Sequence, residues 1–526
     1  MINVILLEVA LILMCLYYFY KLRRGFHMFQ LESYKPERYR TWINKNKKDI
    51  FITRELLLFL PLIILIFHQM AGLITQIVIM ILLWFSRDIY QEKKPLVVTK
   101  RVKRQYTTAG LIAAIFVALN SVAAFKFGMI IQIIMMFIFD LLIFLSMYLV
   151  FIIHVVNLPI ENSINKKFYK TAENKLKEMP DLKVIGITGS YGKTSTKYIL
   201  STILNQKFNV LITPGNYNTL LGVIKTINEN LKSTDQIFIC EMGAKNIGDI
   251  KEICDLVHPK YGVLTSIGPQ HLETFKTLEN VKKTKLELID SIPEDGIAFI
   301  NYDDENIRES NITKKNIKYG IKNQNDVYAY DVKLTEDGSN FNVHTPYGDV
   351  QNIKTKLLGE HNVLNITGAV GIAMSLGLTA DEIKLGITYL KPVEHRLELR
   401  RNSNGLIVID DAYNSNVRGA SRAFEVLKMF KDRTRIIVTP GIVELGEESE
   451  KFNQQLGQKA AECADYVVLV GKKQAPPIKE GLLSMQFPEE KIFVVDTIND
   501  AIKKWQEFPA EKTVVLLEND LPDNYL

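Results

Sequence analysis

A short stretch at residues 184–196, VIGITGSYGKTST, contains the residue types that bind phosphate. Glycines allow the backbone to turn tightly, so that N–H groups point at phosphate oxygens. The lysine after them, Lys193, can neutralise β- and γ-phosphate charge, and the hydroxyl of Thr194 or Ser195 can bind Mg²⁺. We therefore predict a site for a nucleoside triphosphate. Its predicted residues in this loop are Gly189, Ser190, Gly192, Lys193, Thr194 and Ser195.

The spacing of this loop differs from the common phosphate-binding motif GxxxxGK[ST]. Ile187 stands where that motif has its first glycine, so the loop has the form TGSYGKTS. A glycine-rich turn alone is a weak indicator of function, but a Gly-Lys-Thr-Ser run directly after a strand-like apolar segment is specific.

Further candidate side chains follow predicted strands or lie on predicted helices. Glu241 ends the apolar segment of QIFICEMGAKNIGDI, and His271 follows the apolar segment of YGVLTSIGPQHLETF. In a doubly wound parallel sheet, catalytic groups emerge at such strand ends. Lys285 lies on the predicted helix VKKTKLELI, and a later predicted helix carries Asn362. Together with the loop, these residues distinguish one class of nucleotide-binding enzyme from another.

The last part of the chain, residues 395–526, shows strand-like runs separated by helical stretches. Strands that alternate with helices favour a parallel sheet, so we predict a second, Rossmann-like domain here. The runs lie at 406–409, 435–439, 466–470, 492–495 and 513–517.

Several segments between residues 184 and 450, taken in order, resemble the Mur ligase family, the ATP-dependent amide-forming enzymes of peptidoglycan precursor synthesis. The segments are TGSYGKTS, GNYNTLLGV, EMGAKNIGDI, SIGPQHLETF, the helix of Lys285, NYDDEN, GEHNVLN, EHRLE and DDAYNSN. Within the family, the likeness is greatest to the branch that adds a D-alanyl-D-alanine dipeptide. The resemblance implies a central ATP-binding α/β domain followed by a Rossmann-like domain.

The resemblance also implies roles for individual residues. As catalytic residues, Lys193 would hold the ATP phosphates, and His271 and Lys285 would act beside it. Thr194 and Glu241 would bind a first Mg²⁺, and His271 a second. Lys285 matches a lysine that CO₂ carbamylates in much of the family, which makes Lys285 a metal ligand. The modification is chemically reasonable, because a carbamate offers the oxygen donors that Mg²⁺ prefers, whereas an ammonium repels the ion.

Residues further along the chain would contact the nucleotide. Asn362 matches an asparagine that contacts the adenine in the family. Arg396 and Asp410 would reach the nucleotide from the C-terminal domain, where Tyr413 and Asn414 would frame it. A hinge just before Arg396 would close this domain over the ATP domain. The implied reaction transfers the γ-phosphoryl group to a carboxylate, and an amine then attacks the acyl phosphate.

Two features depart from the family pattern. About thirty residues, which read as one polar helix, separate the last apolar run from the loop, so no UDP-binding domain is predicted there. The family's Lys-Gly-Ser near the final strand is absent, and the chain ends LLENDLPDNYL. Both departures concern substrate recognition and leave the ATP-binding residues in place.

The first 155 residues contain apolar runs of membrane-spanning length. A span needs about 20 residues at a rise of 1.5 Å each. The second and third runs are short and share the turn HQMAG, so a re-entrant hairpin, and hence four spans instead of five, stays open. Glu8 and Asp140 fall inside apolar runs, where ionisable groups are costly. The predicted spans are 2–20, 52–68, 71–86, 108–125 and 130–154.

Basic residues lie on one side of these runs. Nine Lys and Arg residues fall between 21 and 50 and seven between 87 and 107, whereas the turns near 69 and 127 hold only Lys126. The positive-inside rule then places the N-terminus outside and everything after residue 155 in the cytoplasm. This topology also explains the net charge of +6, so nucleic-acid binding is not predicted. A cleaved signal peptide is disfavoured, because no basic segment precedes the first run.

The four cysteines carry no metal or disulfide pattern. Cys15, Cys240, Cys254 and Cys463 are scattered, and no CxxC pair occurs. Neither a zinc ribbon nor a disulfide framework is therefore predicted, which is consistent with a reducing cytosol.

We predict a chain of three parts, namely a transmembrane helical bundle over 1–155, a central ATP-binding α/β domain over 156–394 and a C-terminal Rossmann-like domain over 395–526. The predicted function is a membrane-anchored, ADP-forming ligase of cell-envelope biosynthesis that uses ATP and Mg²⁺. It would join a carboxylate, on a precursor that can be lipid-linked, to the amine of an amino acid or dipeptide.

Other functions stay open at this point. One is an ordinary D-alanyl-D-alanine-adding precursor ligase that is tethered to the membrane, and another is a polyglutamate- or folate-type ligase. A transporter is disfavoured because no LSGGQ-like signature is present. A nucleotide-sensing membrane regulator is the other non-enzyme alternative. The sequence does not specify the amine, the carboxylate, the pathway or the oligomeric state.

Overall fold

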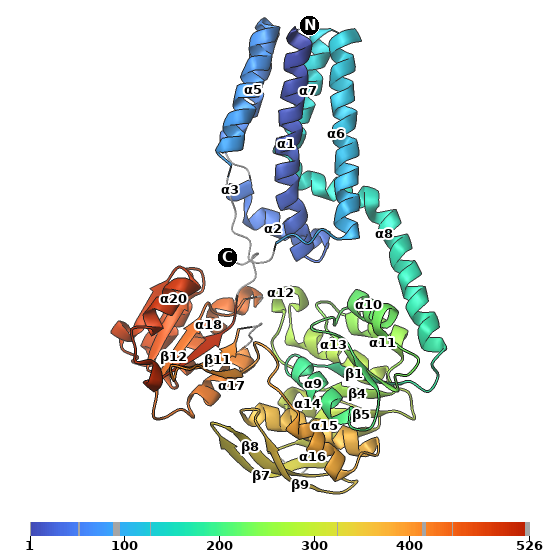
Figure 1. Ribbon diagram of the computed structural model, residues 1–526, viewed down its shortest axis with the longest axis vertical. Helices are drawn as coiled ribbons and strands as arrows, with labels where there is room; N and C mark the ends of the chain where they lie inside the picture. Colours follow the sequence, from blue (N-terminus) through green and yellow to red (C-terminus); the bar gives the residue numbers. More distant parts are fainter. Residues whose placement is uncertain are drawn as a thin grey trace. The chain divides into compact units, whose positions relative to one another are not determined.

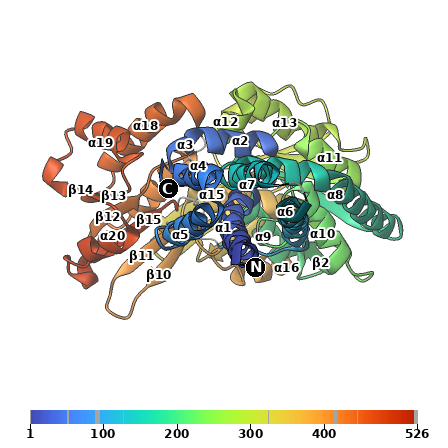
Figure 2. The same cartoon turned by 90° about the horizontal axis from the view of Figure 1, so that it is seen from above.

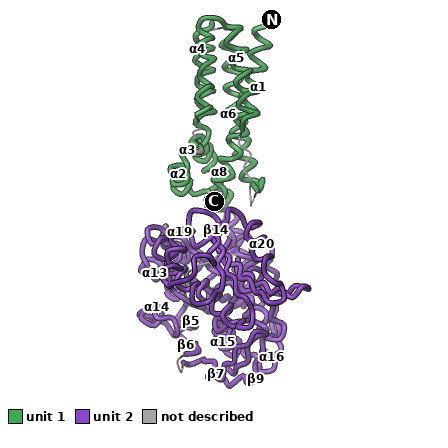
Figure 3. The backbone as a smooth tube through the Cα atoms, turned by 90° about the vertical axis from the view of Figure 1, so that its left-hand side faces the viewer, with its two compact units in different colours: residues 1–166, 522–526 green, residues 167–521 purple. Residues whose placement is uncertain are grey.

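The computed structural model describes residues 2–50, 53–87, 95–126, 128–322, 325–412, 417–443 and 445–520. The chain forms two compact units, one within residues 1–166 and the other within residues 167–521 (Figure 3). The boundary falls inside one long helix. Each unit has its own core of buried apolar side chains.

Unit 1 is helical. Its elements are α1 (Ile2–Leu31), α2 (Pro36–Lys45), α3 (Lys47–Ile50), the 3₁₀ helix η1 (Thr53–Phe59), α4 (Leu60–Phe67), α5 (Gln69–Phe85), α6 (Lys100–Lys126), α7 (Met129–Phe144) and the first part of α8 (Ser146–Lys177). Helix α1 packs against α5, α6 and α7, and Figure 2 looks along this bundle. Large apolar side chains also stay exposed on all four of these helices. An exposed apolar surface of this kind is typical of a surface that contacts lipid or protein.

Among the described residues, three helices are long and apolar enough to cross a membrane, namely α1, α6 and α8. Helices α5 and α7 are apolar but have only 17 and 16 residues. The predicted span 52–68 consists of η1 followed by α4. Pro61 lies in the first turn of α4. Proline is tolerated in that turn because its missing N–H has no partner there in any case.

The predicted span 130–154 is wrong as a single helix. Helix α7 ends at Phe144 and α8 begins at Ser146. Two carbonyl groups beside this break accept hydrogen bonds from other helices. Lys21 Nζ donates to the carbonyl of Phe144 at 3.4 Å, and Tyr39 Oη donates to that of Met147 at 3.1 Å. The bond from Lys21 supplies a donor to the carbonyl that ends α7, where the helix has no N–H of its own to offer.

Unit 2 contains a nine-stranded sheet with the strand order β2-β3-β1-β4-β5-β6-β7-β8-β9 (Figure 1). Neighbours from β2 through β7 are parallel, and β7, β8 and β9 pair antiparallel. Of these strands, β1, β3 and β4 correspond to segments predicted from the sequence, and β2 and β5 to β9 were not predicted. The bounds are β1 (Lys183–Thr188), β2 (Val210–Ile212), β3 (Ile237–Glu241), β4 (Tyr261–Leu264), β5 (Ile297–Asn301), β6 (Asn316–Gly320), β7 (Val327–Thr335), β8 (Gly338–His344) and β9 (Val350–Thr355).

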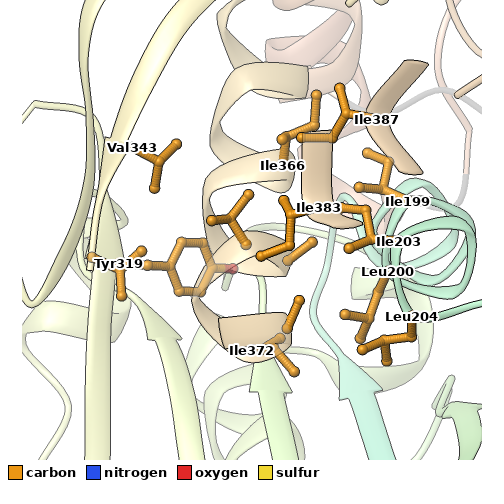
Figure 4. Packing of buried hydrophobic residues seen from close by; sticks show 14 of the residues in the cluster. Ile199, Leu200, Ile203, Leu204, Tyr319, Val343, Ile366, Ile372, Ile383 and Ile387 are labelled. Carbon is orange, nitrogen blue, oxygen red and sulfur yellow. The ribbon is translucent and has the colours of Figure 1, made fainter. Parts of the chain in front are cut away.

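Helices cover both faces of this sheet, because successive strand residues point to opposite faces. Ile185 and Ile187 of β1 belong to a core with α9, α15 and α16, whereas Val184 packs with α10, α11 and α13. Figure 4 shows the first of these cores, where isoleucines and leucines of α9 face those of α15 and α16. The helices are α9 (Lys193–Leu204), α10 (Leu220–Asn230), α11 (Asp249–Val257), α12 (Leu272–Phe275), α13 (Leu278–Asp290), α14 (Glu305–Arg308), α15 (Glu360–Ser375) and α16 (Ala380–Thr388).

The last turns of α8 belong to unit 2. Ala172 is buried in the same core as Val184. Lys175 Nζ donates to the carbonyl groups of Ile227 at 3.3 Å and Asn228 at 2.7 Å. The polar helix predicted before the loop is therefore confirmed, and its end is fixed to the ATP domain.

A second sheet of six strands has the order β10-β11-β15-β12-β13-β14, and only the pair β10 and β11 is antiparallel. The five strands predicted from the sequence are confirmed to within two residues at each end, and β10 was not predicted. The bounds are β10 (Glu398–Arg401), β11 (Ile407–Asp411), β12 (Thr434–Thr439), β13 (Tyr466–Val470), β14 (Ile492–Val495) and β15 (Thr513–Glu518). The accompanying helices are α17 (Val417–Leu427), α18 (Ser449–Ala461), α19 (Ala475–Ser484) and α20 (Ile498–Trp505).

Candidate nucleotide and metal site

The phosphate loop connects β1, which lies between β3 and β4 in the sheet, to the first turn of α9. Gly192 has a φ of +83° and Gly189 a φ of +151°. A Cβ at Gly189 would lie 2.1 Å from Thr265 Oγ1. Both positions therefore require glycine, and the turn that they make ends at a helix N-terminus, where N–H groups favour anions.

Residues 265–268, which follow β4, support the loop from one side. Ser190 donates through its N–H to the carbonyl of Ser266 at 2.8 Å and through its Oγ to that of Gly268 at 2.9 Å. Tyr191 N donates to Ser266 Oγ at 2.7 Å. Both donors of Ser190, a predicted nucleotide contact, are thus used within the protein, where they hold the loop in shape.

Lys193 points back into the loop. Its Nζ donates to the carbonyl of Gly189 at 2.6 Å and to that of Ser190 at 3.4 Å. Burial, with a smaller contribution from the charge of Arg396, lowers the pKa of Lys193 to about 8 against the opposing effect of Glu241. The ammonium therefore lies against the loop carbonyls, where a phosphate group held by the loop would meet it.

Glu241 ends β3, next to Ile187 of β1 in the sheet register, and is buried. Its Oε1 accepts hydrogen bonds from Thr194 Oγ1 and Asn218 Nδ2, each at 3.1 Å. Its Oε2 forms an ion pair with Lys197 Nζ at 2.9 Å. Burial alone would raise the pKa of Glu241, but the charges of Lys197 and Lys193 outweigh that effect, so the pKa is lowered and the carboxylate is ionised.

Lys197 was missed in the sequence analysis. It lies four residues after Lys193, which places both lysines on one face of α9, and it is fully buried. Its Nζ also donates to the carbonyl of Gly215 at 2.6 Å. The i, i+4 spacing from a predicted phosphate-binding lysine is a signal that could have identified it.

Lys285 lies in α13 with only 2% of its surface exposed. Burial lowers its pKa well below the usual value, and the charge of Lys193 adds to this effect. Glu241 is also among the charges that act on Lys285, so Lys193, Glu241 and Lys285 share one neighbourhood. His271 immediately precedes α12, in a left-handed backbone conformation with a φ of +53°.

The residues in this neighbourhood suit Mg²⁺. Thr194 and Glu241 present a hydroxyl and a carboxylate oxygen 3.1 Å apart, and oxygen donors are the ligands that this ion prefers. Among the described residues, no group of three or more His, Cys, Asp and Glu side chains is placed to hold a metal. A magnesium ion here would therefore draw on the hydroxyl of Thr194 and the carboxylate of Glu241, together with oxygen donors from outside the protein.

Helix α15 borders the loop. Asn365 Oδ1 would lie 3.2 Å from a Cβ placed on Gly192. Asn362, the predicted adenine contact, lies one turn earlier and is buried, and its Nδ2 donates to the carbonyl of Leu358 at 2.8 Å. The same helix thus carries the predicted base contact and restricts the space around Gly192.

Two residues predicted to reach the nucleotide come from the C-terminal part of the chain, Arg396 from the segment before β10 and Asp410 from β11. The charge of Arg396 lowers the pKa of both Lys193 and Lys197, so Arg396 acts on the phosphate loop electrostatically. Asp410 is buried, and its Oδ2 lies 2.8 Å from His395 Nδ1 and 3.1 Å from Arg400 Nη2. His395 was not predicted as its partner. Tyr413 and Asn414 lie outside the described residues.

The two α/β sheets, with a phosphate loop at the carboxyl end of the first, define a two-domain nucleotide-binding protein. Residues 187–373 match the family model "Mur ligase middle domain", and residues 395–518 match "Mur ligase, glutamate ligase domain". Together these matches span more than half of the chain, and the chain belongs to the Mur ligase family, as predicted.

Curated relatives with this similarity share one name, UDP-N-acetylmuramoyl-tripeptide–D-alanyl-D-alanine ligase. The Escherichia coli protein is 35% identical over 296 residues, which are 55% of this chain and 65% of that protein. The Bacillus subtilis protein is 29% identical over 338 residues, which are 64% of this chain and 72% of that protein. The chain thus spans only about two thirds of these relatives.

Solved structures show the same similarity. MurF from Acinetobacter baumannii superimposes with a TM-score of 0.61 and 29% identity over 68% of this chain and 77% of that chain. MurF ligase from Thermotoga maritima, solved in complex with ADP, has a TM-score of 0.61 and 28% identity over 68% of this chain and 80% of that chain.

Proposed function

We propose that this chain is an ATP-dependent, ADP-forming ligase that joins a carboxylate to an amine through an acyl phosphate. One observation carries the proposal. In a member of the Mur ligase family, the phosphate-loop hydroxyl of Thr194 lies 3.1 Å from the buried, ionised carboxylate of Glu241, beside the ammonium of Lys193. A hydroxyl, a carboxylate and an ammonium at one loop suit the binding of a nucleoside triphosphate with its Mg²⁺.

The reaction requires activation because a carboxylate is a poor electrophile. The γ-phosphoryl group moves from ATP to the substrate carboxylate, the amine attacks the acyl carbon, and phosphate leaves. Lys193 binds the β- and γ-phosphates and stabilises charge as it develops on the transferred group, which is largely an electrostatic contribution. Thr194 and Glu241 would hold Mg²⁺, which supplies further neutralisation of phosphate charge when it is bound.

Lys285 and His271 complete the proposed site. Burial lowers the pKa of Lys285 and so favours its neutral amine, which is the form that reacts with CO₂. The carbamate would add oxygen donors beside Glu241 in a neighbourhood that otherwise holds the cations Lys193 and Lys197. His271 would bind a second Mg²⁺. Asn362, Arg396 and Asp410 would contact the nucleotide, as the family resemblance implies.

We further propose that unit 1 anchors the ligase in a membrane through five spans, with both α/β domains in the cytoplasm. The exposed apolar side chains of α1, α5, α6 and α7 support lipid contact. Helix α5, at 17 residues, would be about 25 Å long, which is close to the thickness of a bilayer core. A cysteine introduced at His68 should react with an impermeant reagent in intact cells, and one introduced at Lys103 only after permeabilisation. The reverse pattern would refute this topology.

The carboxylate substrate proposed here is an envelope precursor presented at the membrane. The relatives' names describe a UDP-N-acetylmuramoyl-tripeptide and D-alanyl-D-alanine, but the matched region of this chain starts at residue 187, and the helices of unit 1 precede it. The main alternative is a tethered ligase that uses the soluble precursor. A folate-type ligase is a more distant alternative, since folylpolyglutamate synthase shares the fold at 15% identity.

The test uses the full chain in lipid nanodiscs with ATP and Mg²⁺. ADP release is measured with D-alanyl-D-alanine and a panel of amino acids, each combined with a soluble UDP-MurNAc-tripeptide or with its lipid-linked counterpart. We expect amine-dependent ADP release that is greater with the lipid-linked acceptor. Efficient turnover of the soluble precursor, with no gain from the lipid, would contradict the membrane substrate. ADP release that needs no amine under any condition would contradict ligation and favour a nucleotide-sensing protein.

A further inference from the structure

Lys197 of α9 lies beside Glu241, a residue of the proposed metal site. Its side chain is 0% exposed, and it comes one helical turn after Lys193. Burying a lysine costs free energy unless its charge is paired and its N–H groups donate hydrogen bonds. An apolar residue at this position would avoid that cost. Lys197 is paired on two sides, with Glu241 Oε2 at 2.9 Å and the carbonyl of Gly215 at 2.6 Å.

The two oxygens of Glu241 have different partners. Oε1 accepts from Thr194 Oγ1, the hydroxyl proposed to bind Mg²⁺, and from Asn218 Nδ2. Oε2 is held by Lys197 on the opposite side. The ion pair therefore fixes the rotation of the carboxylate so that Oε1 is directed at Thr194.

Lys197 also connects three elements through the loop of residues 213–219, which follows β2. Gly215, its second partner, belongs to this loop. Glu241 N donates to Thr213 Oγ1 at 3.1 Å, and Gly243 N donates to the carbonyl of Asn218 at 2.7 Å. Helix α9, the end of β3 and this loop thus meet around one ammonium group.

We propose that Lys197 is a positioning residue for the magnesium site. It orients Glu241 so that one oxygen faces Thr194, and it holds the 213–219 loop against the end of β3. It does not contact substrate or nucleotide. This inference rests on the proposed function only in assigning Glu241 and Thr194 to Mg²⁺. Its direct prediction is that Lys197 sets the Mg²⁺ concentration needed for nucleotide binding.

The experiment compares K197M and K197R with the unchanged full chain in nanodiscs. Lys251→Met is the matched control, because Lys251 is an exposed lysine in an i, i+4 ion pair on α11. The first measurement is the binding of a fluorescent ADP as Mg²⁺ is titrated. The second is hydrogen exchange of the 213–219 loop without nucleotide, which needs neither metal nor turnover.

For K197M we expect half-maximal binding to require at least about tenfold more Mg²⁺, which is about 1.4 kcal/mol, with less than a twofold change in binding without the metal. Exchange in the 213–219 loop should also become faster. K197R should recover most of the Mg²⁺ response, because it keeps the charge. If K197M does not fold, K197Q is judged by the same two criteria.

A Mg²⁺ response and loop exchange in K197M equal to those of the unchanged chain and of the Lys251→Met control would overturn the proposal. So would faster loop exchange with an unchanged Mg²⁺ response, since that describes a purely structural lysine. Neither measurement requires the carboxylate or the amine. A failure of ligase activity is therefore distinguishable from a failure of this inference. Absence of Mg²⁺-dependent ADP binding in the unchanged chain would refute both.

Discussion

Two buried carboxylates, one in each unit, have contrasting surroundings. Glu241 in unit 2 accepts two hydrogen bonds at Oε1, from Thr194 and Asn218, and its charge is neutralised by the ion pair of Oε2 with Lys197. Asp140 in α7 of unit 1 accepts a hydrogen bond from Gln76 of α5, whose Nε2 donates to Oδ1 at 2.9 Å. Asp140 Oδ2 and Gln76 Oε1 are buried and have no hydrogen-bond partner among the described residues.

The difference shows what each carboxylate is suited to do. A buried charge is retained only where cations and donors offset its loss of water, and Glu241 has them. Glu241 is thus an ionised acceptor ready for a cation. Within the described part of the chain, Asp140 is bonded to the neutral Gln76, and a proton on Oδ2 would supply the donor that Gln76 Oε1 lacks. Asp140 is therefore suited to joining two helices as a neutral acid.

The largest effect is expected at Glu241. Replacing it with alanine removes the proposed metal ligand and leaves Lys197 buried without its counter-ion, so amine-dependent ADP release should fall by about 100- to 1000-fold. Glu229→Gln is the control, because Glu229 is an exposed carboxylate in a weak surface pair. Rates are measured with the full chain, and thermal unfolding verifies that the variant folds. Activity of the Glu241→Ala variant within twofold of the unchanged chain would remove the distinction between the two carboxylates.

Lys285 supplies the next test, because its modification would turn a cation into a further anionic ligand near Glu241. The lowered pKa favours the neutral amine, which is the form that reacts with CO₂. Removing CO₂ from the buffer should lower the rate several-fold, and bicarbonate should restore it. Lys285→Arg should lose about 100-fold and be insensitive to CO₂. An active Lys285→Arg variant, together with a rate that ignores CO₂, would rule out the carbamate.

The charge of Lys193 predicts how the affinity for ATP changes with pH. Its pKa of about 8 in the ligand-free protein means that Lys193 is mostly charged below pH 8 and loses its proton as the pH rises above that value. Affinity for ATP should therefore weaken above pH 8, by up to about tenfold per pH unit. The Lys193→Arg variant should show no such trend, because arginine stays charged. Parallel pH profiles for both proteins would assign the titration to another group.

The smallest effect is expected at Asp140. Asparagine offers both an acceptor and a donor to Gln76, so Asp140→Asn should change the free energy of unfolding by less than about 0.5 kcal/mol, whereas Asp140→Ala should cost about 1–3 kcal/mol. Unfolding in detergent measures both values. An Asp140→Asn variant as unstable as Asp140→Ala would show that unit 1 needs the charged carboxylate, as unit 2 does.

Much of the fold followed from local patterns. Five strands of the second sheet were predicted to within two residues, because alternating apolar runs and helical stretches encode a parallel sheet directly. Strands β2 and β5 to β9 were not predicted, and among them β7, β8 and β9 pair antiparallel and mix buried with exposed residues. The break between α7 and α8 was missed because Lys21, which donates to the carbonyl that ends α7, comes from a distant part of the chain.

The sequence by itself determined the family, the phosphate loop and the list of candidate ligands, because these depend on residue types at fixed short spacings. Only the tertiary structure showed that Glu241 divides its two oxygens between Thr194 and Lys197, that both donors of Ser190 serve the loop itself, and that Asp140 is joined to Gln76. Hydrogen bonds and burial depend on which side chains meet across elements, and local sequence spacing does not contain that information.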